Sequence, residues 1–325
     1  MRRPFGAIAR SAWARALVSA GLLALVLTQI DLSQAGERLS GGRWGLFSAA
    51  AAIDFVSFLL AAWRWHLYLR AAGLESSPAT AIRAYLVGTF ANTFLPSQVG
   101  GDVARAFLAS GSGTRLRAAT TVVVDRATAL ACLIAVGWIA AAASPGEVPG
   151  ELWAALGAAT GVAGVGMAGA AFLVGSRRAA RLVPARLRGP RREIAQAARA
   201  CARKKVLAQT LVAGLAFQGL ILLAAWLLVR AISLDLALPA LAASLAPVLI
   251  VSLLPVSLGG LGVREGSYVV LLGYAGLAPA DATVFSLLGA ASFLLASLPG
   301  AVALVVRPRA ASPAGEGRSA AEGTR

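Results

Sequence analysis

Seven long apolar runs limit the folds that are open to this chain. Runs of this kind cross the roughly 30 Å of membrane hydrocarbon as helices. They are Ala16–Ile30, Gly45–Trp63, Thr120–Ala143, Leu152–Gly175, Val206–Val229, Ala237–Leu254 and Thr283–Val306. Hydrophobic residues make up 58% of the sequence and charged residues only 14%, which is outside the range of soluble globular proteins. We therefore predict an all-α polytopic integral membrane protein with about seven to eight transmembrane helices.

Two further apolar pieces, Ile82–Leu95 and Tyr268–Leu277, are too short for an ordinary span, and each adjoins a glycine-rich break. We interpret them as half-helices or re-entrant segments, and full spans stay open as the alternative.

The positive charges indicate the orientation, because cytoplasmic loops retain lysine and arginine. Ser176–Lys205 holds eleven basic residues and one acid, whereas Ser144–Glu151 carries two acids and no basic residue. We predict that the first segment is cytoplasmic and that the second lies on the opposite side. The expected divisions are a basic cytoplasmic N-terminus (1–15), a membrane domain (16–306) with its basic loop (176–205), and a disordered cytoplasmic tail (307–325). The net charge of +16 then reflects topology and anionic lipid, and we expect no nucleic-acid partner.

An eleven-residue motif occurs twice. "LPSQVGGDVAR" (Leu95–Arg105) and "LPVSLGGLGVR" (Leu254–Arg264) share leucine, proline, an aliphatic residue, a glycine pair and arginine at the same spacing. Chance is a poor explanation for this joint pattern. A repeat that interrupts apolar segments at matching places in two halves is the sequence sign of a transporter substrate site.

The residues of the motif suit a phosphate. Proline ends the preceding helix, glycines let successive N–H groups face one concavity, and an arginine one turn into the next helix adds a charged fork. We therefore predict lipid-phosphate binding by Pro96, Gly100, Gly101, Arg105, Pro255, Gly259, Gly260 and Arg264. In the alternative reading, the glycine pairs permit close helix packing and the arginines extend to the membrane surface.

Several other charges lie inside predicted spans. A charge at the membrane centre costs about 2.5–3.5 kcal/mol on insertion scales, so such residues face a partner or a wet cavity. We expect Asp54 to face the protein interior, where it carries protons, pairs with an arginine, or fixes packing. The intramembrane polar or proton-carrying candidates are Asp54, Asp102, Asp125, Arg126 and Glu265.

The sequence offers little for catalysis or metal binding. His66 is the only histidine, Cys132 and Cys201 are the only cysteines, and no paired aspartates or nucleophile arrangement stands out. We expect no catalytic residue, no metal site and no cofactor.

Three stretches closely resemble one family. "NTFLPSQVGGDVAR" (Asn92–Arg105), "VVVDRAT" (Val122–Thr128) and "LLPVSLGGLGVREG" (Leu253–Gly266) are similar to the transmembrane part of lysylphosphatidylglycerol synthetases. The resemblance extends from about Ala16 to Val306. It implies a flippase-like domain, which in the bifunctional relatives is taken to move an aminoacylated phospholipid. Stand-alone members are similar to proteins found with glycosyltransferases and with hopanoid or polyprenyl-lipid pathways.

Only nineteen residues follow Val306, so we expect the synthetic activity of the bifunctional relatives to be missing here. The leading hypothesis is a non-enzymatic translocator of a phosphate-bearing lipid in the bacterial inner membrane, with the headgroup held between the two motifs. One alternative is a subunit or scaffold for a lipid-modifying enzyme or glycosyltransferase, and another is a membrane enzyme acting on a lipid phosphate. The expected partners are membrane lipids and, in the scaffold alternative, that enzyme.

The side on which each motif lies depends on Ile82–Leu95. If this segment is re-entrant, the charge pattern predicts that both motifs lie on the same side of the membrane. An inverted repeat, with the motifs entering from opposite faces, is the alternative.

Overall fold

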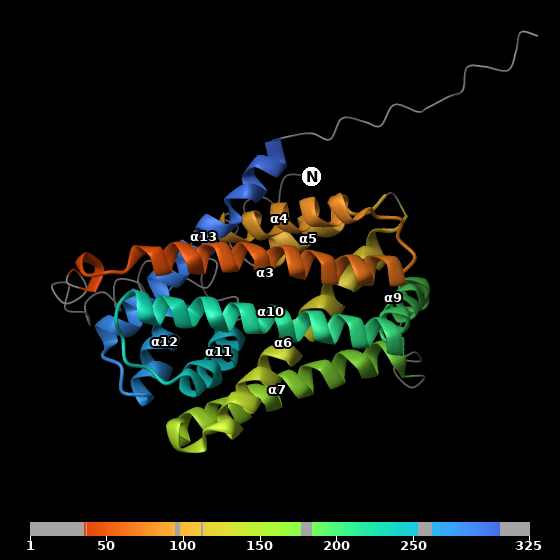
Figure 1. Cartoon of the computed structure of the whole chain (residues 1–325). Coiled ribbons are helices and arrows are strands. Elements are labelled where there is room, and N and C mark those ends of the chain that lie inside the picture. The colour runs from red at the N-terminus through yellow and green to blue at the C-terminus, as the bar shows by residue number, and fades with distance from the viewer. Residues whose placement is uncertain are drawn as a thin grey trace, which may run out of the picture.

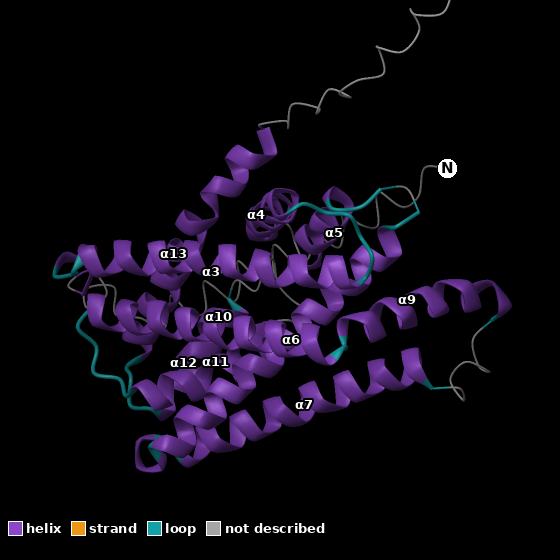
Figure 2. Cartoon of the chain, turned by 45° about the vertical axis from the view of Figure 1, so that its right-hand side comes forward, coloured by secondary structure: helices purple, strands orange, loops and turns teal. Residues whose placement is uncertain are grey.

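The computed structural model describes residues 36, 38–94, 98–111, 113–176, 184–252 and 262–305, and every regular element in this part of the chain is helical. The helices form one bundle in which α3, α7 and α10 extend along its length (Figure 1, Figure 2). In chain order they are α3 (Trp44–Ala71), α4 (Pro78–Phe94), α5 (Gln98–Leu108), α6 (Arg115–Ala143), η1 (Pro145–Glu147), α7 (Gly150–Gly175), η2 (Ala185–Leu187), α9 (Arg188–Cys201), α10 (Lys204–Ala231), α11 (Leu238–Ser252), α12 (Val263–Tyr274) and α13 (Pro279–Val305).

Among the described residues, five helices are long and apolar enough to cross a membrane: α3, α6, α7, α10 and α13, with 26 to 29 residues each. They contain five of the seven predicted spans almost entirely, and the predicted class of all-α polytopic membrane protein is confirmed. The predicted span Ala16–Ile30, the N-terminus 1–15 and the tail 307–325 lie outside the described residues.

Helices α3 and α10 are antiparallel neighbours (Figure 1). At one end of the bundle the amide of Arg43, just before α3, donates to the carbonyl oxygen of Ala231, the last residue of α10, at 2.8 Å. Toward the other end the hydroxyl of Tyr68 donates to Oγ1 of Thr210 at 2.9 Å. The end of α3 and the end of α10 therefore lie at opposite ends of the bundle.

A short helical hairpin follows α3. Helices α4 and α5 pack against each other, and α6 begins soon after α5 ends. Near the start of α6, Arg117 pairs with Glu193 of α9 at 3.6 Å, and the thiol of Cys201, the last residue of α9, lies 3.8 Å from the carbonyl oxygen of Tyr68. Because α6 starts where α3 finishes, the α4–α5 hairpin enters and leaves at this same end. This arrangement agrees with the re-entrant interpretation of Ile82–Leu95.

A second hairpin, α11–α12, follows α10. Arg38, shortly before α3, pairs with Asp281, near the start of α13, at 2.9 Å. Helix α13 therefore begins at the end where α3 begins and α10 finishes. Since α11 starts and α12 ends at that end, the second hairpin enters from the end opposite to the first.

This arrangement bears on two predictions. Ala237–Leu254 was predicted as a full span; the structure describes this segment as far as Ser252, and the described α11 has 15 residues, about 22 Å at 1.5 Å per residue. The prediction that both motifs lie on the same side required α11 to cross the membrane in full. The hairpins enter from opposite ends, as in an inverted repeat.

The turns after α3 and α10 repeat one another and extend the duplication beyond the predicted motif. Arg70–Glu75 reads RAAGLE and Arg230–Asp235 reads RAISLD. Gly73 and Ser233 both have positive φ, 75° and 54°. The next residues, Leu74 and Leu234, donate their amides to Leu69 and Val229 at 3.0 Å, so each helix ends in the same left-handed turn.

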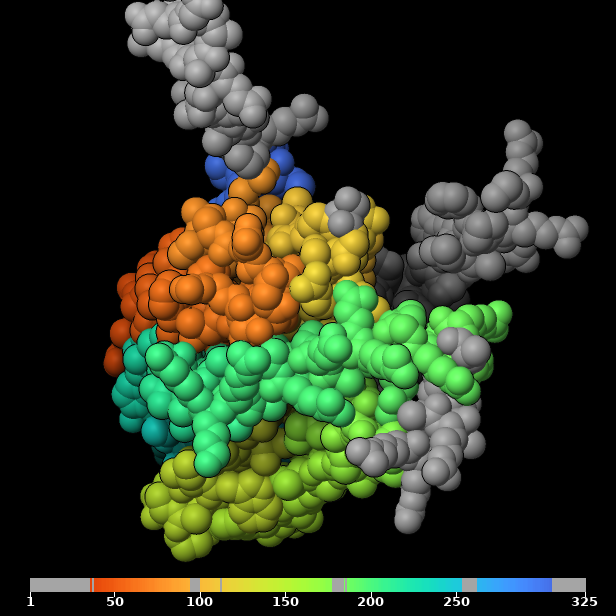
Figure 3. Space-filling view, turned by 90° about the vertical axis from the view of Figure 1, so that its right-hand side faces the viewer, coloured from red at the N-terminus to blue at the C-terminus, as the bar shows by residue number. Residues whose placement is uncertain are grey.

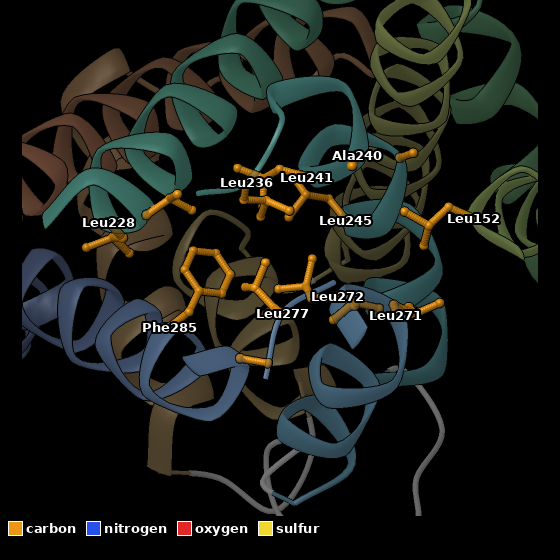
Figure 4. Packing of buried hydrophobic residues seen from close by; sticks show 14 of the residues in the cluster. Leu152, Leu228, Leu236, Ala240, Leu241, Leu245, Leu271, Leu272, Leu277 and Phe285 are labelled. Atoms are coloured by element: carbon orange, nitrogen blue, oxygen red, sulfur yellow. The ribbon is translucent and has the colours of Figure 1, made fainter. Parts of the chain in front are cut away.

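The packing follows the same inverted symmetry. Helix α4 of the first half lies against α13 of the second, and α11 of the second half lies against α6 of the first. The largest apolar core forms in the second half, where leucines of α11 and α12 gather with Leu152 of α7 and Phe285 of α13 (Figure 4). The hairpins are thereby held by helices of the opposite half.

The basic helix α9 closes the end of the bundle where α3 finishes. Its Arg191 donates to the carbonyl oxygens of Leu173, at 2.9 Å, and Ser176, at 2.6 Å, at the end of α7. Figure 3 views this end, with α9 and the start of α10 in green beside α3 in orange. The acidic segment Ser144–Glu151 precedes and begins α7 at its other end, which agrees with the predicted opposite sides.

Candidate functional site

Alternating arginines and aspartates connect α3, α5 and α6. Arg64 of α3 approaches Oδ1 of Asp125 through Nε and Nη2, both at 2.8 Å. The other oxygen of Asp125 accepts a hydrogen bond from Nη1 of Arg105 at 3.2 Å. The three residues are 1%, 1% and 3% exposed, respectively. Buried charges persist when they are paired, so Asp125 is the shared counter-ion of two buried arginines.

Asp102 and Arg126 continue this chain toward the surface. Arg126 donates to both carboxylate oxygens of Asp102, through Nε at 2.9 Å and Nη2 at 3.0 Å. Nε of Arg105 lies 3.1 Å from Asp102 Oδ1 but makes no hydrogen bond. Arg64, Asp102, Arg105, Asp125 and Arg126 are called the arginine cluster below. Its three arginines and two aspartates leave one positive charge in excess.

Arg126 is the accessible member of the arginine cluster. Its side chain is 45% exposed, whereas that of Asp102 is 16% exposed. Because α6 begins at Arg115, Arg126 lies about 16 Å along the helix from that end. An exposed charge at this depth is costly in hydrocarbon, so Arg126 is expected to face water or an anionic group.

Arg105 occupies a different environment from the one predicted. Its guanidinium lies between the rings of Trp65 and Tyr85, with Cζ 4.9 Å from each ring centre. It is also engaged by Asp125 and is 3% exposed. The structure therefore places this predicted phosphate ligand in the protein interior, with its charge already paired.

Gly101 allows α4 and α5 to approach closely. Its amide donates to Oδ1 of Asn92 at 2.8 Å, and a side chain at this position would meet the carbonyl oxygen of Gly88. The close-packing reading of the motif fits Gly101, since its N–H group has a partner within the hairpin. Gly100 lies beside it on α5 and is partly buried, and Pro96 lies outside the described residues.

Another buried acid directly follows the second motif. Glu265 is fully buried, and its Oε2 accepts the amide of Gly262 at 2.6 Å at the start of α12. Its Oε1 accepts Nη2 of Arg264 at 2.7 Å and lies 3.4 Å from the hydroxyl of Ser286. The side chain of Arg264 is 28% exposed. Pro255, Gly259 and Gly260 lie outside the described residues.

The structure does not bring the two motif arginines together. Among the described residues, Arg105 and Arg264 share no partner. Their hairpins enter from opposite ends of the bundle. The two motif arginines thus belong to two separate charged sites, of which only the arginine cluster has excess charge.

Asp54 of α3 is 8% exposed, which confirms that it faces the protein interior. The hydroxyl of Ser292 of α13 donates to its Oδ2 at 2.5 Å. Asp54 was expected to pair with an arginine or to face a wet cavity. No arginine pairs with it among the described residues. The carboxyl group stays separate from the arginine cluster.

Sequence reasoning missed Arg64. The predicted span ended at Trp63, one residue before it, but α3 continues to Ala71. The available signal was the charge balance: Asp125 inside a predicted span needs a cation, and Arg64 directly follows another predicted span.

A comparison with protein families matches residues 12–300 to the family described as lysylphosphatidylglycerol synthase TM region. The chain belongs to this family. The match includes both hairpins and the whole arginine cluster. The resemblance predicted from the motifs is confirmed. Comparisons with curated proteins and with solved structures gave no match.

Proposed function

We propose that this lysylphosphatidylglycerol synthase TM region translocates a phosphate-bearing lipid across the bacterial inner membrane. The lipid is a phospholipid, an aminoacyl-phospholipid or a polyprenyl-linked lipid. The observation that carries the proposal is the excess positive charge of the arginine cluster, with Arg126 exposed well inside the length of α6. One anionic phosphate at Arg126 would balance that charge.

Arginine chemistry supports this assignment. Arg126 uses Nε and Nη2 toward Asp102, and a guanidinium has five N–H donors, so further donors remain for a phosphate. In this proposal Arg126 contacts the headgroup. Arg64, Asp125 and Arg105 hold the hairpin and the local charge in place, which modifies the role first expected of Arg105.

The inverted repeat supports the transport half of the proposal. Broken helices that enter from opposite ends, each packed on helices of the other half, are typical of transporters in which a central site is exposed alternately to the two sides. The α4–α5 hairpin carries Asp102 and Arg105, so a movement of this hairpin relative to α6 would change the access to Arg126.

A second candidate function is a scaffold for a lipid-modifying enzyme or a glycosyltransferase. The observation that favours it is the exposed basic surface around α9, formed by Arg186, Arg188, Arg192, Arg199, Arg203, Lys204 and Lys205. An acidic surface of a cytoplasmic enzyme would complement these charges. Neither candidate function assigns a catalytic step to this chain.

Transport in proteoliposomes tests the proposal. The protein is reconstituted with a fluorescent phospholipid or polyprenyl phosphate, and an impermeant quencher is added outside. Lipid in the inner leaflet stays fluorescent unless the protein moves it to the outer leaflet. We expect the wild-type protein to make the lipid of both leaflets accessible to the quencher, and we expect Arg126→Gln to translocate much less lipid. Chemical conversion of the lipid without translocation would instead favour an enzyme, and neither activity would favour the scaffold.

The ion pair of Arg38 with Asp281 gives a matched control. It has the same two-bond geometry as Arg126 with Asp102, at 2.9 and 3.2 Å, and a similarly exposed arginine at 40%. It lies at the opposite end of the bundle, away from the arginine cluster. Arg38→Gln should translocate lipid normally, and equal loss in both variants would contradict a specific role of Arg126.

A further inference from the structure

Asp54 is a buried carboxyl group to which no described side chain brings a positive charge. Its one described side-chain partner is the hydroxyl of Ser292, and α3 and α13, which carry the two residues, belong to different halves of the repeat. We propose that Asp54 is a proton-binding site that couples lipid movement to a proton gradient. The coupling rests on the proposed translocation, whereas proton binding by Asp54 does not depend on it.

The charged groups on the helices around α3 are engaged elsewhere. Arg83 of α4 donates to the carbonyl oxygen of Ala303 at 2.9 Å. On α6, Asp125 and Arg126 belong to the arginine cluster, and the basic residues before them lie in its first turn. The remaining charges are Lys204, Lys205 and Arg230 at the ends of α10, Glu193 and the arginines of α9, and Asp281 of α13, which pairs with Arg38.

Asp54 therefore gains or loses a proton without breaking an ion pair. In the charged form, the hydroxyl of Ser292 donates to the carboxylate. After one proton is taken up, the neutral acid remains within hydrogen-bonding distance of the same hydroxyl. The Asp125 carboxylate differs, because its protonation would leave Arg64 and Arg105 unbalanced in the interior.

A shallow groove with a volume of about 230 Å³ lies beside this carboxyl group. It is lined by Ser48, Ala51 and Phe55 of α3 and by Leu295, Ala296 and Pro299 of α13. Asp54 and Ser292 lie within one turn of these lining residues on their own helices. The lining is apolar apart from Ser48, and it extends from near the start of α3 to Pro299, 20 residues beyond the start of α13, so the groove does not assign one end of the bundle to the proton.

The repeat places no second proton site in the matching position. A shift of 160 residues, which relates Arg70 to Arg230, relates Asp54 to Gly214 and Cys132 to Ser292. In the structure Gly214 and Cys132 are indeed neighbours, and a side chain on Gly214 would meet the sulfur of Cys132. The contact between α3 and α13 thus brings together a carboxyl and a hydroxyl group, whereas the matching contact between α10 and α6 packs Gly214 tightly against Cys132.

The contacts favour a proton over a metal cation. A hard cation such as Ca²⁺ needs six to eight oxygen ligands, and even a small one demands a nearly complete shell of oxygens and waters. Asp54 and Ser292 supply one carboxylate and one hydroxyl, and the part of the chain that the structure describes contains no group of metal-binding side chains.

Infrared titration of the full-length protein tests proton binding directly. A protonated carboxyl group gives a carbonyl stretching band that disappears on ionisation. We expect a band that grows as the pH falls, that is lost in Asp54→Asn, and that changes its midpoint in Ser292→Ala. Asp235→Asn, which alters an exposed acid in the turn after α10, should keep the band. Identical titrations for wild type and Asp54→Asn would overturn the proton site.

Transport under a pH gradient tests the coupling. Proteoliposomes with a pH gradient of one orientation should translocate fluorescent lipid faster than those without a gradient. Asp54→Asn should lose this gradient-dependent part, whereas Asp235→Asn should keep it. A wild-type rate that ignores the gradient, or an equal response in Asp54→Asn, would overturn the coupling. If the wild type moves no lipid under any condition, the proposed function fails, and the infrared titration still decides whether Asp54 binds a proton.

Discussion

Gly101 of α5 and Gly88 of α4 pack backbone against backbone within the first hairpin. A side chain at Gly101 would meet the carbonyl oxygen of Gly88 and the side-chain amide of Asn92. Both contacts belong to the same antiparallel pair of short helices. The second glycine of the motif's pair, Gly101, therefore permits the close approach of α4 and α5.

We expect Gly101→Ala to destabilise the fold by about 1–3 kcal/mol, because an added methyl group must push the two helices apart. Gly101→Val should be worse. Gly166→Ala on α7 is the control, since nothing lies within 4 Å of a side chain there, and alanine is the better helix former. Denaturation of the purified variants in detergent measures the difference. An equal stability of Gly101→Ala and Gly166→Ala would show that α4 and α5 are not in contact at this point.

Asp125→Leu should destabilise the protein by about 3–5 kcal/mol. The change leaves Arg64 and Arg105, two almost fully buried guanidinium groups, without their shared counter-ion. Asp281→Leu is the matched control, because it breaks an ion pair whose arginine is 40% exposed and should cost about 1 kcal/mol or less. The same denaturation measurement applies. Similar losses for the two variants would mean that the arginine cluster is hydrated in the membrane-embedded protein.

The sequence predicted the long helices well, because a run of more than twenty apolar residues has one stable arrangement in a bilayer. It also favoured a re-entrant Ile82–Leu95, because its 14 residues are too few for an ordinary span. For Ala237–Leu254 the apolar run predicted a single crossing, whereas α11 and α12 form a hairpin that starts and finishes at the same end of the bundle. Composition alone does not reveal which helices pair into a hairpin.

The candidate site was predicted only in part. Asp102, Asp125 and Arg126 were predicted as intramembrane polar residues and Arg105 as a phosphate ligand of the motif, so four of the five members of the arginine cluster were named. Their pairing was not predictable, because it depends on how α3, α5 and α6 are placed in space. The turn repeat RAAGLE and RAISLD is present in the sequence, but its shared left-handed turn was not predictable, because serine in the second copy is an uncommon residue at a positive φ.

Glu75 and Asp235 occupy matching positions in that turn repeat and provide the topology test. Both are exposed, and they follow helices that finish at opposite ends of the bundle. We expect the cysteine in Glu75→Cys to react with a membrane-impermeant thiol reagent only from the cytoplasmic side, and the cysteine in Asp235→Cys only from the outside. Labelling of both from one side would contradict the inverted repeat.

The native cysteines should give little background in this experiment. Cys132 and Cys201 are buried and free. Burial also raises the pKa of the Cys201 thiol to about 11, so near neutral pH almost none of it is the reactive thiolate. The unmodified protein should therefore remain unlabelled until it is unfolded, and rapid labelling of the folded wild type would show that α9 does not stay packed on α3.

Arg105 and Arg264 should act independently of each other. Arg105→Ala removes a guanidinium that lies between two aromatic rings and pairs with Asp125, and we expect a loss of about 3 kcal/mol in stability. Arg264→Ala removes the charged partner of buried Glu265 and should cost about 1.5–3 kcal/mol. Because the two arginines share no partner among the described residues, the double variant should lose the sum of the single losses within about 0.5 kcal/mol. The free energy of unfolding in detergent, measured for all four proteins with and without the translocated lipid, gives the test. With lipid present, the double variant could lose at least 1 kcal/mol less unfolding free energy than that sum while remaining additive without lipid. This result would show that both arginines hold one phosphate in a conformation different from this one.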